Sequence, residues 1–470
     1  MKEVRISKHA PTLGRRILVQ LKNIKLESIL CGVLVASAAL SAFANPAMAQ
    51  AGKLDPTFGA GGIFIESAGE FNNTGTFGTA IALQSNGEIV AGGQIGFNTG
   101  VIRLNANGTL DSTFGKGGTV SAILGSNDGN CQVIGLVLQT DGKIVVGITN
   151  LQQGFGPLFI VARLNTNGSL DTTFGSGGIV ETQVGTFGVA ASALALQSDG
   201  KILLAGSGAM ARYLSNGSLD SSFGSGGIAA TPISGPTAIA EQPDGKILLA
   251  AGGPAQGASA TPVGLAYAFT QVAGVISRYD ANGSLDTSFG TAGQAGSLAV
   301  VSAIAVENSG GCVSTCNILA AGMIANNPST GSSVLSVGFG VVRYNSNGSV
   351  DSTFGTGGGV TNSFTPQEPL AMPFALALQS NGDIVAAGTA GQVGSPIFVT
   401  QADFALARYT SSGTLDTTFG SNGEATMAFG TNEAAIYGLT IQTDGKIVAV
   451  GTSLAGNQAG GLVVARYLGQ

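Results

Sequence analysis

The sequence predicts an all-β fold, a seven-bladed β-propeller with four-stranded blades. Three observations lead to this prediction. A six-residue motif recurs seven times, short apolar strands alternate with glycine turns between its copies, and the two ends of the repeated region are out of phase. The chain has 75 glycines, yet its hydrophobic fraction is 44%. A disordered chain would not be that apolar, whereas many short strands joined by glycine turns would be.

The repeated motif reads [Leu or Val]-Asp-x-[Ser or Thr]-Phe-Gly. Its aspartates are separated by 49 to 66 residues. Such variable spacing between near-identical copies indicates that the strands are fixed and the loops vary. The copies lie at 54–59, 110–115, 170–175, 219–224, 285–290, 350–355 and 415–420.

Each full unit between motifs is predicted to contain four strands, here named A to D. In the clearest unit these strands are expected at 192–197, 202–206, 210–214 and 218–220. Asp199-Gly200 and Asn216-Gly217 form the turns after strands A and C, because these pairs tolerate positive φ. Residues 223–227 are then expected to cross to the next blade. Nearly continuous apolar strands suit sheets that neighbouring blades cover on both faces.

The two ends of the repeated region complement each other. It opens at Leu54-Asp55, which has the pattern of a strand D, and it closes at 465–468, which has the pattern of a strand C. Pairing 53–58 beside 463–468 would complete the last blade with its missing outer strand. The pairing would also remove an open edge that could template aggregation.

Residues 1–49 are predicted to be a secretory signal peptide. A basic leader precedes an apolar run from Ile29 to Ala44 that is too short to span a membrane comfortably. Ala47-Met48-Ala49 then predicts cleavage before Gln50. The alternative is an uncleaved membrane anchor. We therefore expect residues 50–470 to be exported as a propeller to the periplasm, the outer surface or the medium, with no membrane span after cleavage.

Removal of this leader changes the charge balance. It takes seven of the 20 basic and two of the 26 acidic residues, leaving 13 against 24 and a net charge of −11. The single histidine, His9, leaves with it. General acid–base catalysis would then depend on carboxylates, Tyr or Lys, so we expect no enzyme and no catalytic residue. Without a basic patch, nucleic acid and anionic membranes are poor partners.

The repeat resembles a known family. Leu194-Ala-Leu-Gln-Ser-Asp-Gly-Lys-Ile-Leu-Leu-Ala-Gly206, with the motif that follows it, is similar to the bacterial delta-60 repeat. The resemblance covers essentially all of 53–468 and implies a β-propeller and export, with no active site. One unit departs from it, because Glu307 to Cys316 replaces the Asp-Gly or Asn-Gly turn.

Three cysteines remain after the leader. Cys312 and Cys316 could form a short-loop disulfide in an exported protein, and Cys131 is left over. The pair is expected on the face of the tight turns and Cys131 on the opposite face. Three cysteines without histidine make a poor metal site.

All seven arginines after the leader occupy the same position of strand C. In six units the motif aspartate follows eight residues later. The arginines could form a ring of binding groups, or each could pair with an aspartate across the C–D hairpin. One-to-one matching favours pairing. The expected pairs are Arg103–Asp111, Arg163–Asp171, Arg212–Asp220, Arg278–Asp286, Arg343–Asp351, Arg408–Asp416 and Arg466–Asp55.

The connections divide between two faces. The A–B and C–D turns define the tight-turn face, and the B–C and D–A connections define the long-loop face. Long segments such as 252–274, 323–338 and 389–401 fall in the second class, which marks it as the expected binding face. Seven acids outside the repeat are expected in D–A segments: Glu66, Glu70, Asp128, Glu181, Glu368, Glu424 and Glu433. They provide solubility, or they form an electronegative face for divalent cations or basic partners.

These observations predict an exported, non-catalytic, monomeric scaffold that binds a protein or a glycan on its long-loop face. No cofactor is expected, and a divalent cation is left open. A structural, envelope-associated repeat protein is one alternative, and a propeller hydrolase or lyase is another. In the last case Glu66 and Glu70 would be the closest acids in one loop.

Overall fold

The computed structural model of the chain describes residues 50–67, 76–96, 98–124, 131–150, 158–185, 190–233, 235–252, 274–296, 298, 300–307, 312, 316–325, 337–364, 370–394, 398–429, 433–454 and 461–469. Residues 1–49 form a separate unit outside these ranges, so the signal peptide stays a prediction. Within the described ranges, no helix has the length and apolar character that crossing a membrane would need.

The repeat unit is a four-stranded antiparallel run, seen most simply in β10 (Ala191–Leu196), β11 (Ile202–Gly206), β12 (Ala209–Tyr213) and β13 (Ile228–Ala230). Strand B starts with a fully buried isoleucine, Ile202, which pairs with Leu196 on one side and Tyr213 on the other. Every described strand B starts in this way. The same buried isoleucine therefore marks the level at which strands A, B and C are aligned at the tight-turn end of each unit.

Three further sheets have the same four-stranded pattern. They are β2 (Phe77–Leu83), β3 (Ile89–Ile95), β4 (Asn98–Leu104) and β5 (Thr119–Ser121); β6 (Cys131–Leu138), β7 (Ile144–Asn150), β8 (Leu158–Leu164) and β9 (Ile179–Gln183); and β14 (Pro236–Glu241), β15 (Ile247–Ala251), β16 (Val275–Tyr279) and β17 (Gln294–Ala295).

The remaining strands form one sheet of twelve. It contains β18 (Val300–Val306), β19 (Ile318–Ala325), β20 (Val337–Tyr344), β21 (Gly359–Asn362), β22 (Leu370–Leu378), β23 (Ile384–Gly394), β24 (Phe398–Tyr409), β25 (Glu424–Met427), β26 (Glu433–Ile441), β27 (Ile447–Leu454), β28 (Gly461–Tyr467) and β1 (Ile63–Ser67).

The prediction of seven separate blades is therefore wrong: the described strands form five sheets, four of four strands and one of twelve. Strands β20 and β24 extend far enough toward the long-loop face to reach the inner strand that follows each of them. Val337 bridges Leu370 and Ala402 bridges Glu433, both in parallel. Two single bridges thus join three antiparallel runs into one sheet.

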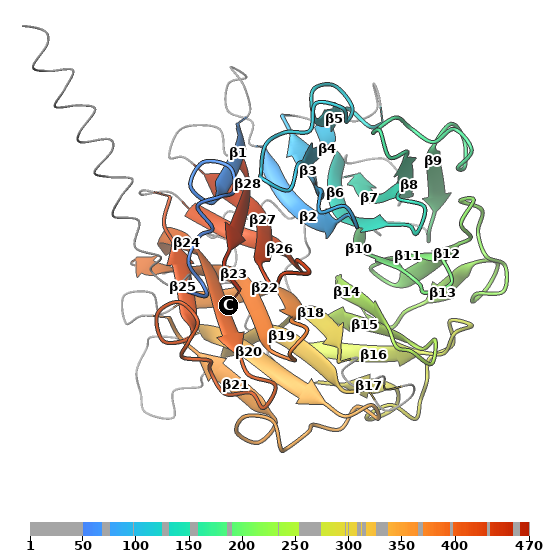
Figure 1. The fold of residues 1–470 in the computed structure, drawn as a ribbon. Coiled ribbons are helices and arrows are strands. Elements are labelled where there is room, and N and C mark those ends of the chain that lie inside the picture. Colours follow the sequence, from blue (N-terminus) through green and yellow to red (C-terminus); the bar gives the residue numbers. More distant parts are fainter. Residues whose placement is uncertain are drawn as a thin grey trace, which may run out of the picture. The chain divides into compact units, whose positions relative to one another are not determined.

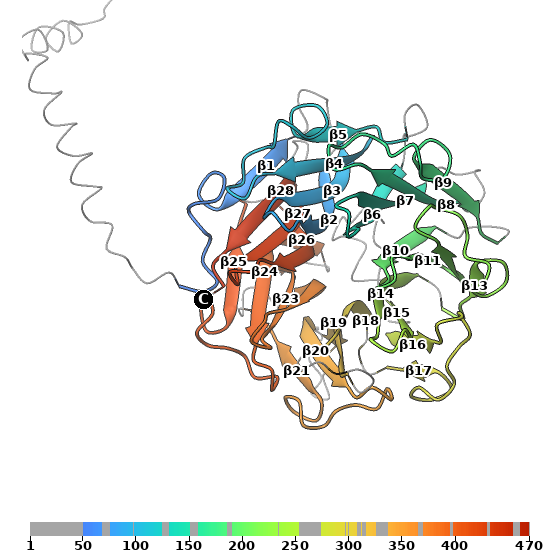
Figure 2. The ribbon, with the colours of Figure 1, turned by 45° about the vertical axis from the view of Figure 1, so that its right-hand side comes forward.

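The sheets of residues 50–470 follow one another around a common centre, with the strands A innermost (Figure 2). These strands contact each other in the order β2, β6, β10, β14, β18, β22, β26 and back to β2. Buried side chains fill the space between neighbouring sheets. Phe174 and Val161, for example, pack with Leu204 and Ala211 of the next sheet. This packing explains why the strands are apolar on both faces.

The outer strand lies later in the sequence than predicted. Leu219 makes only an isolated bridge to Tyr213, and strand D is β13, which starts after the Phe-Gly-x-Gly-Gly segment. This segment is a turn within the unit and not a crossing to the next one. Gly227 has φ 100°, and a Cβ there would lie 2.7 Å from the Leu219 Cβ. The Ser225 amide donates to Ile228 O at 2.7 Å, which closes the turn at the start of β13.

The N-terminal strand β1 pairs with β28, so the first and last described strands lie side by side (Figure 1). Residues 53–58, predicted to be this strand, instead provide one bridge from Leu54 to Tyr467. The two chain ends also build one turn together. The amide of Gly52 donates to Leu468 O at 2.7 Å, as Gly217 does to Leu214 within an unbroken turn. The closing unit is therefore cut within its C–D turn.

Candidate functional site

The repeat ion pair is the most regular polar feature of the molecule. Arg212 Nε donates to Asp220 Oδ2 at 2.9 Å, and both side chains are buried. The other carboxylate oxygen, Oδ1, accepts the amide of Ser222 at 3.1 Å and its hydroxyl at 2.6 Å. The guanidinium lies 4.4 Å from the centre of the Phe223 ring. One motif thus supplies the anion, the hydrogen-bond donors and the aromatic face around each arginine.

The structure brings together all seven arginine–aspartate pairs listed above. Their Nε–Oδ2 distances lie between 2.7 and 2.9 Å. Each arginine also donates through Nη1 to a carbonyl in the C–D turn of the neighbouring unit, as Arg103 does to Thr166 O at 2.6 Å. The arginines therefore connect strand C, the motif and the next unit. These roles occupy the guanidinium groups and make the ring of arginines a structural network.

The closing pair joins residues 411 positions apart. Arg466 Nε donates to Asp55 Oδ2 at 2.9 Å and Nη1 donates to Ala106 O. Lys446 Nζ lies 3.3 Å from the same carboxylate. Burial opposes ionisation of Asp55, but hydrogen bonds from Thr57, the charge of Arg466 and a hydrogen bond from Lys446 outweigh it and lower the pKa to about 2.

The sequence reasoning missed two further members of this network. The lysine of the A–B turn reaches the motif aspartate in some units, for example Lys143 to Asp171 at 3.0 Å. The glutamine before the turn approaches the arginine, as Gln139 Oε1 does to Arg163 Nη1 at 3.3 Å. Glutamine occupies this position in six units. That recurrence was the signal that could have revealed its role.

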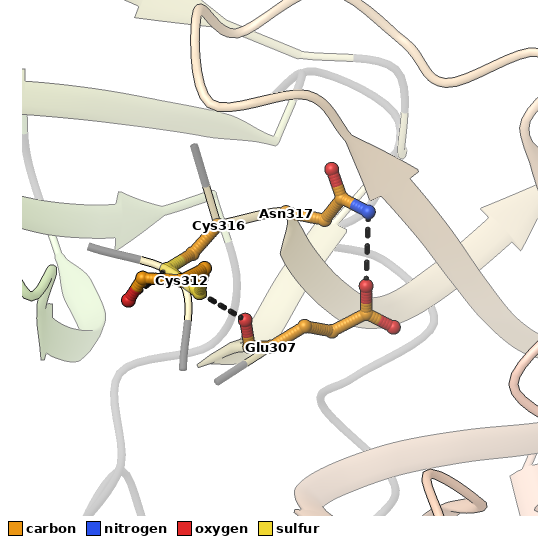
Figure 3. The surroundings of a disulfide bond; sticks show 4 residues. All are labelled: Glu307, Cys312, Cys316 and Asn317. Carbon is orange, nitrogen blue, oxygen red and sulfur yellow. Dashed lines mark hydrogen bonds between the residues drawn. A yellow bond between two sulfur atoms is a disulfide. The ribbon is translucent and has the colours of Figure 1, made fainter. Parts of the chain in front are cut away.

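Cys312 and Cys316 form a disulfide with a Cα–Cα distance of 5.4 Å. They lie between β18 and β19, in an A–B connection and hence on the tight-turn face, whereas the buried Cys131 starts β6 at the other end of a strand A. Glu307 takes the place of the repeat glutamine. Its Oε2 accepts a hydrogen bond from Asn317 Nδ2 at 3.1 Å, and the Cys312 sulfur lies 3.1 Å from its backbone carbonyl (Figure 3).

We expect replacement of both Cys312 and Cys316 by serine to lower the free energy of unfolding by about 2 kcal/mol, the loop-entropy value for so short a loop. Urea unfolding of the oxidised proteins measures this. Reductant should lower the stability of the wild type equally and leave the double variant unchanged. A reductant effect of the same size in the double variant would contradict the assignment.

The candidate acids do not form one cluster. Glu66, Glu181, Glu424 and Glu433 lie in β1, β9, β25 and β26, so their expected placement in D–A connections was wrong. Glu424 accepts a hydrogen bond from Asn362 of the adjacent run at 2.8 Å. Glu70, Asp128 and Glu368 lie outside the described residues. Within the described ranges, no three His, Cys, Asp or Glu side chains are placed to hold a metal ion.

Two of these acids are shielded from water. Burial raises the pKa of Glu66 and of Glu433 above the ordinary value of 4.5. Both belong to the closing unit and lie toward the long-loop end of their strands, where Glu66 pairs with Leu462 and Glu433 with Leu454. A carboxylate in such a setting favours a positively charged neighbour.

Within residues 50–470, basic side chains by contrast lie at the tight-turn ends of the strands. Arginines end strand C, four lysines lie in A–B turns, Lys53 lies in the closing turn and Lys116 in a glycine turn. By sequence, no B–C or D–A connection contains Lys, Arg or His. The long-loop face therefore has acids and no basic residue to neutralise them.

The inner strands carry one further departure from the repeat. Each strand A has a bulge, and the bulged residues are Thr79, Ile134, Ser192, Thr237, Ser302, Phe374 and Tyr437. Phe374 and Tyr437, on neighbouring strands, are both half-buried, and their ring centres lie 5.3 Å apart.

Comparison with known sequences agrees with this repeat. Residues 84–114, 139–174, 197–223, 263–289, 331–354, 379–419 and 442–469 match the family described as a domain of unknown function (DUF5122) beta-propeller. The chain is a β-propeller repeat protein. A search of curated proteins finds no match.

Several solved structures are similar to this chain at low identity. An ulvan lyase from a new family of polysaccharide lyases is 12% identical, with 86% of this chain and 96% of that chain covered and a TM-score of 0.44. An inactive virginiamycin B lyase from Staphylococcus aureus is also 12% identical, with 85% and 98% covered and a TM-score of 0.42. For a protein of unknown function from Dyadobacter fermentans the values are 12%, 87%, 100% and 0.37. At these scores the propeller has no demonstrated activity in common with them.

Proposed function

We propose that this propeller is an exported, non-catalytic scaffold of the delta-60 repeat type that binds a protein or a glycan on its long-loop face. The supporting observation is the contrast between the two faces. Repeated ion pairs and turns occupy the tight-turn face, where charge is matched within each unit. On the other face the connections vary in length, and by sequence none of them contains a basic residue. Repeat scaffolds usually bind through the face on which the units differ.

The non-catalytic part of the proposal rests on the chemistry of the titratable groups. Residues 50–470 contain no histidine, which is the side chain best suited to proton transfer near neutral pH. The motif aspartates, which have the largest pKa decreases, are bound to arginines. An aspartate held in this way remains ionised and does not exchange a proton during turnover.

A site-directed block tests which face binds. Cys131 is buried and Cys312 is in a disulfide, so an added surface cysteine is the reactive thiol. Ala230 is exposed at the long-loop end of β13, and Thr140 is exposed in an A–B turn. Ala230→Cys and Thr140→Cys, each coupled to polyethylene glycol, form a matched pair.

We expect the coupled Ala230→Cys protein to lose capture of envelope proteins and glycans in a pull-down, and the coupled Thr140→Cys protein to retain it. Blocking by the Thr140 label alone would place the binding surface on the tight-turn face. Equal capture by both, with no loss relative to the unlabelled protein, would also contradict the proposal.

A further inference from the structure

We propose that Phe374, Tyr437 and Glu433 form a seat for an organic cation, the side chain of a lysine or arginine from a basic partner. This inference rests on the proposed binding function and specifies its ligand chemistry. The bulges of two neighbouring inner strands, β22 and β26, carry the aromatic residues Phe374 and Tyr437.

At three of the other bulges a small hydroxyl side chain connects two inner strands. Thr79 Oγ1 donates to Val133 O at 2.6 Å, and Thr237 Oγ1 donates to Val301 O at 2.8 Å. Ser192 donates to Pro236 O at 2.5 Å. Each hydroxyl thus connects one inner strand to the next. Neither Phe374 nor Ile134 of β6 can donate such a bond, but Ile134 is buried in the core whereas Phe374 remains partly exposed. Core packing therefore does not fully explain the aromatic residue at this position.

The aromatic pair is supported from behind. Phe374 packs against a separate apolar cluster of Val300, Met323 and Met372. The Phe374 and Tyr437 rings are tilted by 38° with their centres 5.3 Å apart. Both side chains remain partly exposed while the cluster behind them is buried. Two partly exposed aromatic rings therefore lie side by side on β22 and β26, and the apolar cluster packs against one of them.

The carboxylate lies on the same strand as the second ring. Glu433 begins β26 at its long-loop end and is half-buried. Half-buried and buried residues alternate along β26, and this alternation places Glu433, Ala435 and Tyr437 on the same side of the strand. Burial, and then the Glu433 charge, raise the pKa of Tyr437 to about 12. Burial also raises the pKa of Glu433. A cation beside Glu433 would stabilise the ionised carboxylate, which burial disfavours.

Aromatic faces beside a carboxylate are the combination that recognises an ammonium or guanidinium group. The surrounding connections reinforce that choice, because no B–C or D–A segment carries a basic residue that could fill the seat from within the chain. An anionic ligand would meet only repulsion from the same surface. A basic partner is therefore the occupant that the charges favour.

The test uses the full mature chain and a decalysine peptide as the probe, at low salt. Phe374→Leu and Tyr437→Leu keep apolar volume but remove the aromatic face, and each should weaken binding by about five-fold, the usual size of one cation–π contact. Tyr437→Phe keeps the ring and should bind within about two-fold of the wild type. Glu433→Gln should weaken binding at least as much as the loss of a ring.

Glu181→Gln is the matched control. It removes one exposed acid from β9 and should leave decalysine affinity nearly unchanged. Absence of decalysine binding by the wild type would overturn the seat. Equal losses for Glu181→Gln and Glu433→Gln, with no effect of either leucine variant, would overturn it as well and leave only a diffuse acidic surface. The polyethylene glycol block decides the face independently, so failure of the seat and failure of the binding function give different results.

Discussion

Replacing Asp55 with asparagine is expected to lower the free energy of unfolding by roughly 3–5 kcal/mol, the usual cost of removing one partner from a buried ion pair. Asp55 is 2% exposed and Arg466 5% exposed. The variant would leave the Arg466 guanidinium buried beside a neutral amide, and Lys446 would keep only its contact with Asp444. Chemical denaturation of the wild type and the variant measures the difference.

A second readout separates closure from ordinary ion-pair loss. Asp220→Asn removes the corresponding contacts to the arginine and the hydroxyl within one continuous unit, from Arg212 at 2.9 Å and from Ser222. Both variants should lose stability, but only Asp55→Asn should speed proteolysis within residues 50–67. Arg466→Met combined with Asp55→Asn should cost less than the sum of the single changes. Identical digestion patterns for Asp55→Asn and Asp220→Asn would contradict closure by this pair.

Local sequence patterns predicted much of the fold correctly. Ile202 and Gly206 were predicted to bound strand B and do so, and strands A and C differ from prediction by one residue. The Arg212–Asp220 register followed from a spacing of eight across an x-Asn-Gly turn. The same rule located the partner of Arg466, because the last unit had no local aspartate. These features depend on residues close in sequence or on an exact repeat, which a single sequence displays.

What the sequence did not reveal depends on contacts between units. The outer strand was placed too early because Leu219-Asp220 looks like a strand, whereas Ile228–Ala230 is short and follows three glycines. Fusion of three runs into one sheet depends on two bridges, such as Val337 to Leu370, that arise only when long strands approach each other. The Phe374–Tyr437 pair likewise required the positions of two bulges, which leave no periodic signal.

Acid is expected to destabilise this propeller more steeply than its modest charge density suggests. Every motif aspartate has a folded-state pKa below the ordinary value of 3.8, since hydrogen bonds and nearby cations outweigh the effect of burial. A lowered carboxyl pKa contributes stability that is complete above the unfolded-state value and is lost as pH falls toward the folded-state value.

For Asp55 the shift from 3.8 to about 2 corresponds to about 2 kcal/mol. The other six aspartates act in the same direction. The unfolding temperature should therefore stay nearly constant from neutral pH to about pH 5 and fall progressively between about pH 4 and pH 2. Calorimetric scans across this range measure the decline.

Glu66 and Glu433 supply the opposing control. A raised carboxyl pKa favours folding at low pH, and that contribution is lost as pH rises through the folded-state value. Glu66→Gln should therefore raise the unfolding temperature at pH 7 and have little effect at pH 3. Asp55→Asn should do the reverse, with its largest loss at pH 7 and a smaller one near pH 2, where the wild-type carboxylate is itself becoming protonated. An unfolding temperature that stays constant between pH 5 and pH 2 would show that these ion pairs do not lower the pKa values of the motif aspartates in the folded state.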